Sequence, residues 1–349
     1  MKHFLDIKSL INSDYYKNNK RINWHVNHLN YDDFTKDLHD WLSDIDLLEE
    51  EREVFEISKV FIYTELASYL THVYDYIILT DKGIIPEYSK ESDIFIDKIW
   101  NKKTIQKTLL IELEKNRFQK KYTHFFYSFI VRMFPKKYVK TLLVSLNDLA
   151  KQHTKEKKKF TLKIIPQYLF KINTKSSKFS RGLSNKIKDF LVTNIEENYF
   201  ILNFDHKESI EFILDSYIAR VHNDISSYNG FLSGFNNNAT AITGTGNSYY
   251  NRLFSSILKK EGVKVFRFNH GGERCFYVDL HFWENGDLFQ TDIYFTYGKK
   301  WKIWLEKIVK KSGKKIKIQS IGSDYHSKIY NKFVNNKNNK NNKNNKNNK

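Results

Sequence analysis

The chain has 349 residues, of which 40% are hydrophobic and 16% aromatic, so it can fold about two domains and is not a wholly disordered protein. Its formal net charge of +18 favours an anionic partner, but lysine outnumbers arginine by 49 to 9, a composition that does not point to nucleic-acid recognition. The single cysteine, Cys275, excludes an intrachain disulfide and indicates a reducing compartment.

No segment has the pattern of a secretory signal or a membrane span. The start, "MKHFLDIKSLINSD", lacks a continuous apolar stretch behind its basic residue. The most hydrophobic segment, residues 60–80, is interrupted by Glu65, His72 and Asp75. We therefore expect a cytoplasmic protein whose positive charge is compatible with peripheral contact to an anionic membrane.

Residues 1–152 are predicted to be mainly helical. Apolar residues recur every three or four positions over 33–48, and a longer helix is expected from about residue 47 to residue 79. Two further helices are predicted over 92–116 and 136–152. The next segment, 153–203, mixes a charged run with Ser/Lys-rich sequence and is expected to be an irregular basic connector.

Residues 204–334 alternate helices with strands. A first helix starts with Asp205 and Glu208 in capping-box spacing. After it come "ATAIT", a helix closed by Gly262, "VKVFRF", "TDIYFTYG", another helix and "KIKIQSIGSD". This order predicts an α/β fold with a Rossmann-like parallel sheet, whose ligands bind at the carboxyl ends of the strands. The last residues, 335–349, repeat Asn-Asn-Lys and are predicted to be disordered.

Three glycine-bearing loops follow predicted strands: "TGTGNS" (243–248), "NHGGER" (269–274) and "GSDYH" (322–326). Glycine lets backbone amides approach a ligand closely, and the first loop leads into a helix whose amino end attracts anions. That loop either presents amides and hydroxyls to a phosphate or packs the strand tightly against the helix. The residues concerned are Thr243, Gly244, Thr245 and Gly246.

His270 is the candidate catalytic residue of the second loop. Imidazole titrates near neutral pH and can accept a proton from a hydroxyl, and Gly271 and Gly272 leave room for a substrate beside it. Arg267 and Arg274 flank the loop and either neutralise a phosphate or solvate an edge of the sheet. Any of three acids could orient the imidazole: Asp279, Glu284 or Asp292.

No metal or cofactor is expected. His270, Cys275, Asp279 and His281 lie close in sequence, but their spacing matches no standard zinc site.

The segments "GTGNSYYNRLFSSILKKEGVKVFRFNHGG", "TDIYFTYGKKW" and "IKIQSIGSD" resemble bacterial surface-polysaccharide enzymes of the GT-B fold, over about residues 204–330. These enzymes are capsule and lipopolysaccharide glycosyltransferases and CDP-glycerol glycerophosphotransferases. The resemblance implies that His270 is the catalytic base and that Gly322 and Ser323 form the hinge to a donor-binding domain. It also implies a nucleotide-sugar or CDP-glycerol donor, as substrate, and a glycan acceptor.

The sequence departs from this family after the hinge. A GT-B enzyme has a second Rossmann domain there, whereas this chain runs into the Asn-Asn-Lys repeat. We therefore expect either the acceptor-side half of a transferase, with the donor domain missing or supplied by a partner chain, or a smaller complete protein. The alternatives are a non-catalytic interaction protein that binds a protein partner, anionic lipid or nucleic acid, and a hydrolase or epimerase on the same fold.

Overall fold

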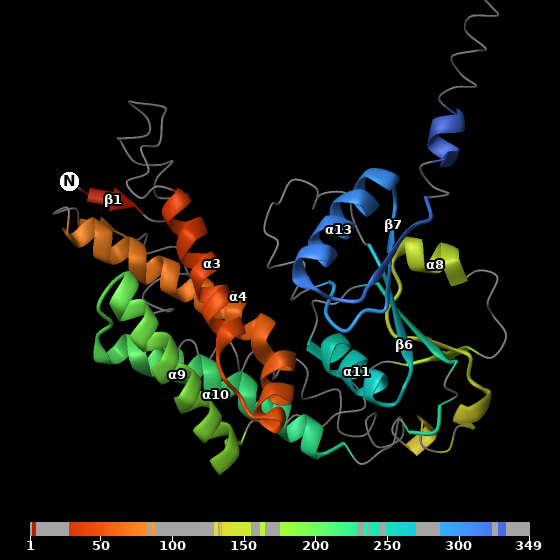
Figure 1. Cartoon of the computed structure of the whole chain (residues 1–349), viewed down its shortest axis with the longest axis horizontal. Coiled ribbons are helices and arrows are strands. Elements are labelled where there is room, and N and C mark those ends of the chain that lie inside the picture. The colour runs from red at the N-terminus through yellow and green to blue at the C-terminus, as the bar shows by residue number, and fades with distance from the viewer. Residues whose placement is uncertain are drawn as a thin grey trace, which may run out of the picture. The chain divides into compact units, whose positions relative to one another are not determined.

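The computed structural model describes residues 2–4, 28–81, 85–87, 129–131, 133, 135–154, 161–164, 175–228, 233–235, 238–244, 249–269, 287–322 and 327–332. The chain forms two compact units, each built from two segments (Figure 1). Residues 1–126 and 170–229 form the helical unit, and residues 127–169 and 230–349 form the sheet unit. This division differs from the boundaries expected from the sequence, because each unit combines two segments that are far apart in the sequence.

The helical unit is built around long packed helices. They are α3 (His28–Asp44), α4 (Glu49–Asp81), α9 (Lys178–Asn198) and α10 (Phe204–Ser226), beside a short parallel pair of β1 (Lys2–Phe4) and β2 (Ile85–Glu87). Phe34, Leu38 and Leu42 of α3 are buried, as their spacing predicts. The two helices expected over 33–48 and 47–79 are confirmed, with slightly different ends.

Helix α9 lies within the segment that was expected to be an irregular connector, and that expectation was wrong. Leu183, Ile187, Leu191 and Ile195 recur every four residues and are all buried, which is the stripe of an amphipathic helix. The run of polar residues between them concealed this pattern. Ser177 caps the helix by accepting a hydrogen bond from the Ser180 backbone nitrogen at 3.0 Å.

The start of α10 also differs from the prediction. The capping box is formed by Asn203 and His206, because the Asn203 side chain accepts from the His206 backbone nitrogen at 2.8 Å. Asp205 and Glu208 do not form it. The helix itself and its buried stripe through Ile210, Leu214 and Ile218 are confirmed.

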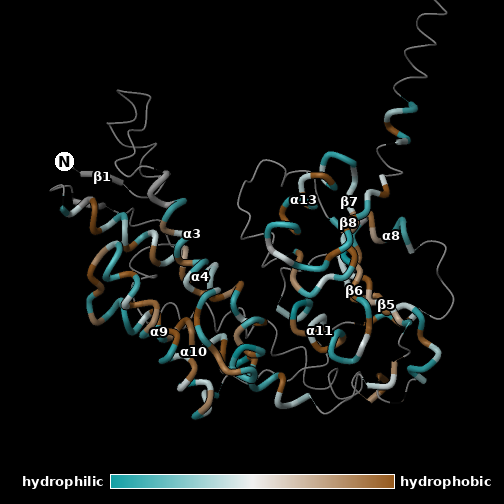
Figure 2. Tube along the Cα trace, viewed as in Figure 1, coloured by the Kyte–Doolittle hydropathy of each residue, from teal (hydrophilic) through white to brown (hydrophobic). Residues whose placement is uncertain are grey.

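The sheet unit contains, in its described part, a six-stranded parallel sheet with the order β4-β3-β5-β6-β7-β8. The strands are β3 (Thr141–Leu143), β4 (Thr161–Lys163), β5 (Thr240–Thr243), β6 (Lys264–Phe268), β7 (Ile293–Thr296) and β8 (Lys317–Ser320). The predicted parallel α/β sheet is confirmed for the four strands after residue 239. Figure 2 shows hydrophobic residues along the central strands.

Helices cover both faces of this sheet (Figure 1). They are α8 (Asp148–Thr154) on one face and α11 (Tyr249–Lys260) and α13 (Lys299–Ser312) on the other, with a short 3-10 helix, η1 (Lys136–Tyr138), ahead of β3. Successive residues of β7 lie on opposite faces of the sheet and belong to different cores. Phe295 packs with Leu149 of α8, whereas Tyr294 packs with Leu305 of α13. The glycines expected to end α11 and α13, Gly262 and Gly313, have positive φ angles of 76° and 67°.

The helix predicted over 136–152 is wrong. Thr141–Leu143 instead form a strand that pairs with β4 on one side and β5 on the other, and the α-helix starts only at Asp148, after the short 3-10 helix η1. The apolar run "VKTLLV" is too short for its periodicity to separate strand from helix. The helix predicted over 92–116 and the repeat 335–349 lie outside the described residues.

Candidate site at the carboxyl edge of the sheet

The chain reverses its direction across the sheet between β3 and β5. From β3 it crosses over to β4 on one side, whereas β5, β6, β7 and β8 follow one another toward the other side. Crossovers of one hand then place α8 on the opposite face from α11 and α13, which is the arrangement observed. Open α/β sheets bind ligands outside the carboxyl ends of the strands at such a reversal. The loops after β3 and β5 therefore define the candidate site.

Thr243 and Gly244, two of the predicted ligand-binding residues, lie at this reversal, but their polar groups are already bound. The Thr243 side chain is 1% exposed, and its hydroxyl lies 3.0 Å from the hydroxyl of Ser145. The Gly244 N–H donates to the Ser145 carbonyl and hydroxyl, both at 3.0 Å. These two residues tie the β5 loop to the β3 loop, which favours the packing interpretation for them.

Asn147 joins the ends of three loops. Its amide nitrogen Nδ2 lies 3.1 Å from the Gly244 carbonyl, 2.9 Å from the Phe268 carbonyl and 3.0 Å from the Asn269 carbonyl. Its Oδ1 accepts from the Ala150 backbone nitrogen at 2.9 Å and so caps α8. One half-buried side chain thus fixes the loops after β3, β5 and β6 relative to one another.

Ser145 and Asn147 were missed from the sequence, together with Asn251, which donates to the Ser145 hydroxyl at 3.4 Å, and the buried Asn269. The signal was present: in "TLLVSLN" an apolar run is followed at once by serine and asparagine, as at the end of a buried strand. It was hidden because the run was assigned to a helix.

The third predicted loop lies away from this reversal. Gly322 has a φ of 72° and follows β8, which is separated from β6 by β7 and from β5 by two strands. At about 4.8 Å per strand, Gly322 stands roughly 14 Å from Gly244 along the edge. Thr245, Gly246, His270, Gly271, Gly272, Arg274 and Ser323 lie outside the described residues, as do Asp279 and Glu284.

Arg267 does not solvate an edge of the sheet, because it is fully buried. Its Nε donates to the Thr291 hydroxyl at 3.0 Å and one terminal nitrogen donates to the Phe289 carbonyl at 3.1 Å. Burial lowers the pKa of Arg267 to about 10, and the carboxylate of Asp287 opposes this shift. The guanidinium therefore fastens the turn before β7 to β6.

Asp292, one of the acids considered for His270, lies within the described residues at the amino edge of the sheet. Its carboxylate accepts from the Val265 backbone nitrogen at 2.7 Å and from Lys259 Nζ at 2.6 Å. Val265 lies at the amino end of β6, whereas residue 270 follows the carboxyl end. The side chain is thus held at the opposite edge of the sheet.

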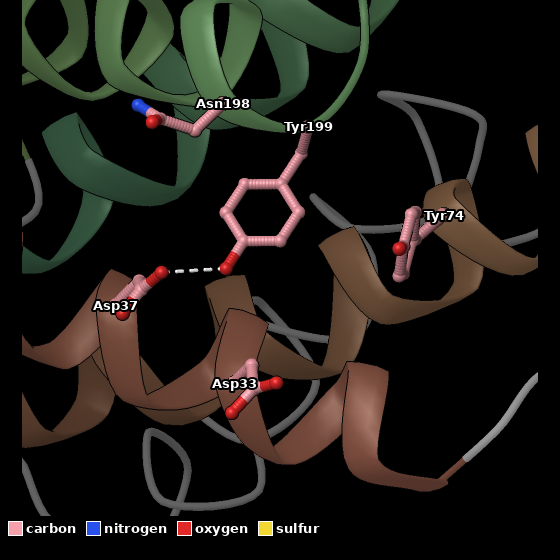
Figure 3. Close-up of a pocket in the computed structure, with 5 residues that line it drawn as sticks. All are labelled: Asp33, Asp37, Tyr74, Asn198 and Tyr199. Atoms are coloured by element: carbon pink, nitrogen blue, oxygen red, sulfur yellow. Dashed lines mark hydrogen bonds between the residues drawn. The ribbon is translucent and has the colours of Figure 1, made fainter.

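The helical unit contains a pocket of about 330 Å³ that the sequence did not indicate (Figure 3). The Tyr199 hydroxyl donates to Asp37 Oδ2 at 2.6 Å, and burial together with Asp37 and Asp33 raises the pKa of Tyr199. The ring of Tyr199 meets that of Tyr74 edge-on, with centroids 6.0 Å apart. The lining residues are Asp33, Asp37, Tyr74, Asn198 and Tyr199.

Among the residues with described side chains, no group of three or more histidine, cysteine, aspartate or glutamate residues is arranged to hold a metal ion. The helices of the described part include none long and apolar enough to cross a bilayer. Comparison with family models, curated proteins and solved structures finds no match to the chain. The class of the sheet unit, a Rossmann-like α/β unit, is established by its strand order and covering helices alone.

Proposed function

We propose that the sheet unit binds a nucleotide-linked donor or its phosphorylated acceptor at the carboxyl ends of β3, β5 and β6, and takes part in glycosyl or glycerophosphoryl transfer to a surface glycan. The observation that carries this proposal is the network of Ser145 and Asn147 at the chain reversal. The network fixes three loop ends at the edge where parallel sheets bind ligands, as a preorganised site requires.

The network supports binding by holding the loops still. Thr243 and Gly244 are satisfied by Ser145, so direct contact with a phosphate falls to the residues that follow, Thr245 and Gly246, ahead of α11. Because α11 follows the carboxyl end of β5, its amino end lies at the same edge of the sheet. The positive end of the helix dipole favours an anion there.

His270, two residues beyond the end of β6, is the proposed general base. It takes the proton of the acceptor hydroxyl as the acceptor oxygen bonds to the anomeric carbon or phosphorus of the donor. The bond from that atom to the nucleotide breaks, and the nucleotide leaves with the electron pair. Gly271, Gly272 and Arg274 follow in the same loop and are proposed to contact the donor phosphates, and Gly322 and Ser323 are proposed to form a hinge after β8.

Calorimetric titration of the full chain with CDP-glycerol and a panel of UDP-, GDP- and dTDP-sugars tests the binding step. We expect saturable binding of at least one donor, weakened about tenfold by Ser145→Ala, because the loss of the hydroxyl removes its hydrogen bonds to Thr243, Gly244 and Asn251 and loosens two loops. His270→Ala is expected to retain binding and to lower the transfer rate about a hundredfold or more. His72→Ala, a half-buried histidine of α4 in the other unit, is the matched control and should change neither quantity.

Absence of binding to every donor and to the free nucleotides overturns the proposal. Binding that Ser145→Ala leaves unchanged would place the site elsewhere and would equally contradict it. Hydrolysis of the donor without any acceptor would replace transfer with a hydrolase activity on the same site.

A further inference from the structure

The solvent face of α13 combines a dense set of lysines with one exposed apolar side chain. Residues 299–317 contain nine lysines and a single acid, Glu306. Ile303 is 55% exposed in the middle of the helix. We define the lysine face as Ile303 with the exposed lysines around it, Lys299, Lys300, Lys307, Lys310 and Lys311.

One side of α13 is buried against the sheet, and the lysine face lies on the opposite side. Leu305, Ile308 and Val309 are buried against Tyr294 and Ile318 of the sheet. Helical geometry places Ile303 on the opposite side, with neighbours three and four residues away on the same surface. Three of those four neighbours are Lys299, Lys300 and Lys307.

The remaining neighbour, Glu306, does not offset this charge over the face as a whole. It forms an ion pair with Lys302 at 3.6 Å, toward one border of the face. The five lysines of the face have no carboxylate within 4.0 Å among the described residues. The face therefore presents a positive field around an apolar centre.

Stability of the helix does not explain the lysines of its first turn. The amino end of a helix carries a partial positive charge, so Lys299 and Lys300 there are unfavourable, and no acid accompanies them. Lys310 and Lys311 in the last turn are favourable for the helix itself. Helix stability thus leaves the first-turn lysines unexplained, and they surround the exposed Ile303.

We propose that the lysine face of α13 docks on an anionic phospholipid membrane, with the helix parallel to the surface. The lysines contact lipid phosphates and carboxylates, while Ile303 enters the boundary between headgroups and acyl chains. Trp301 and Trp304, half-buried with ring centroids 5.0 Å apart, pack against the core beneath the helix and hold it on the sheet. A nucleic acid fits this face less well, because it offers no acyl layer for Ile303. The proposal is independent of the transferase activity.

Co-sedimentation of the full chain with vesicles tests it, using phosphatidylglycerol mixed with phosphatidylcholine and, separately, phosphatidylcholine alone. We expect binding to the anionic vesicles only. Lys307→Gln with Lys310→Gln should lower the partition coefficient about tenfold or more, and Ile303→Ser should lower it about threefold to tenfold.

Each variant has a matched control. Lys178→Gln with Lys264→Gln removes the same charge from exposed positions of α9 and β6, and Ile201→Ser makes the same apolar change at a residue that is 74% exposed. Both controls should bind as the parent does, including any binding by the lysines of the terminal repeat.

Equal losses in test and control variants would show that net charge alone drives binding and would overturn the proposal. A full chain that binds an oligonucleotide more tightly than the anionic vesicles, with no effect of Ile303→Ser, would also overturn it and assign the face to nucleic acid. Circular dichroism of each variant confirms that the fold is retained, since every substituted side chain is exposed.

Discussion

Asn147 and Gly244 lie in van der Waals contact at the reversal of the sheet, and a Cβ atom added at Gly244 would stand 2.9 Å from the Asn147 backbone nitrogen. The same asparagine donates to the Gly244 carbonyl at 3.1 Å. The loops after β3 and β5, which are almost a hundred residues apart in the sequence, are thus fitted to each other without room for a side chain on residue 244.

Gly244→Ala is therefore expected to destabilise the sheet unit by about 1–3 kcal/mol, since backbone must move to admit the methyl group. Gly298→Ala is the control in the same unit, because a Cβ there meets nothing within 4 Å. Chemical denaturation of both variants gives the two free energies of unfolding. A loss for Gly298→Ala as large as that for Gly244→Ala would refute the close-packing explanation.

Asn147→Asp keeps the size of the side chain and replaces the amide donor with an oxygen that faces three carbonyl groups. We expect a loss of about 2–3 kcal/mol, from the lost hydrogen bonds and from repulsion between the oxygens. Hydrogen exchange should become faster in peptides that cover 240–244 and 264–269. Asn185→Asp, an exposed position on α9, serves as the control and should leave exchange in both peptides unchanged.

Arg267→Met removes a buried guanidinium that holds Thr291 and the Phe289 carbonyl. The change also takes a positive charge away from the buried Asp287, whose carboxylate accepts from the Tyr294 hydroxyl at 3.3 Å. Breaking a buried set of charges in this way costs about 3–5 kcal/mol. Lys264→Met, an exposed cation at the start of the same strand, should change the unfolding free energy by less than about 0.5 kcal/mol.

Asp75 of α4 makes the stability of the helical unit depend on pH. Burial raises the pKa of this carboxyl from 3.8 to about 7, so the folded chain binds the proton more tightly than the unfolded chain does. The stability due to this group is therefore full below about pH 4, falls as the pH rises to about 7, and stays low above that. Asp75→Asn removes the buried charge and should raise the unfolding temperature at about pH 8 but not at about pH 4.

Circular dichroism melting curves across that pH range check the prediction. Asp44→Asn, at the exposed end of α3, should melt in parallel with the parent at every pH. A difference between Asp75→Asn and the parent that is constant with pH would contradict the assigned titration.

The sequence alone determined the second half of the sheet and the helices with a long apolar stripe. From residue 239 each strand is separated from the next by a helix or loop with its own start or stop signal, such as Gly262 and Gly313, so local information was sufficient. The helices α3, α4 and α10 were found for the same reason. The candidate residues Thr243 and Gly244 were correctly placed at the carboxyl end of a strand.

Only the tertiary structure decided where the site lies and what surrounds it. Thr141–Leu143 form an inner strand because β4 and β5 pair with it on its two sides. A segment of three residues is too short for its periodicity to predict this pairing. That pairing brought Ser145 and Asn147 to Gly244, and a similar long-range contact buried Arg267 and held Asp292 at the other edge. Hydrogen bonds between residues about a hundred positions apart produce no periodic pattern in the sequence. The residues of the site could therefore be identified only from the contacts within the folded sheet.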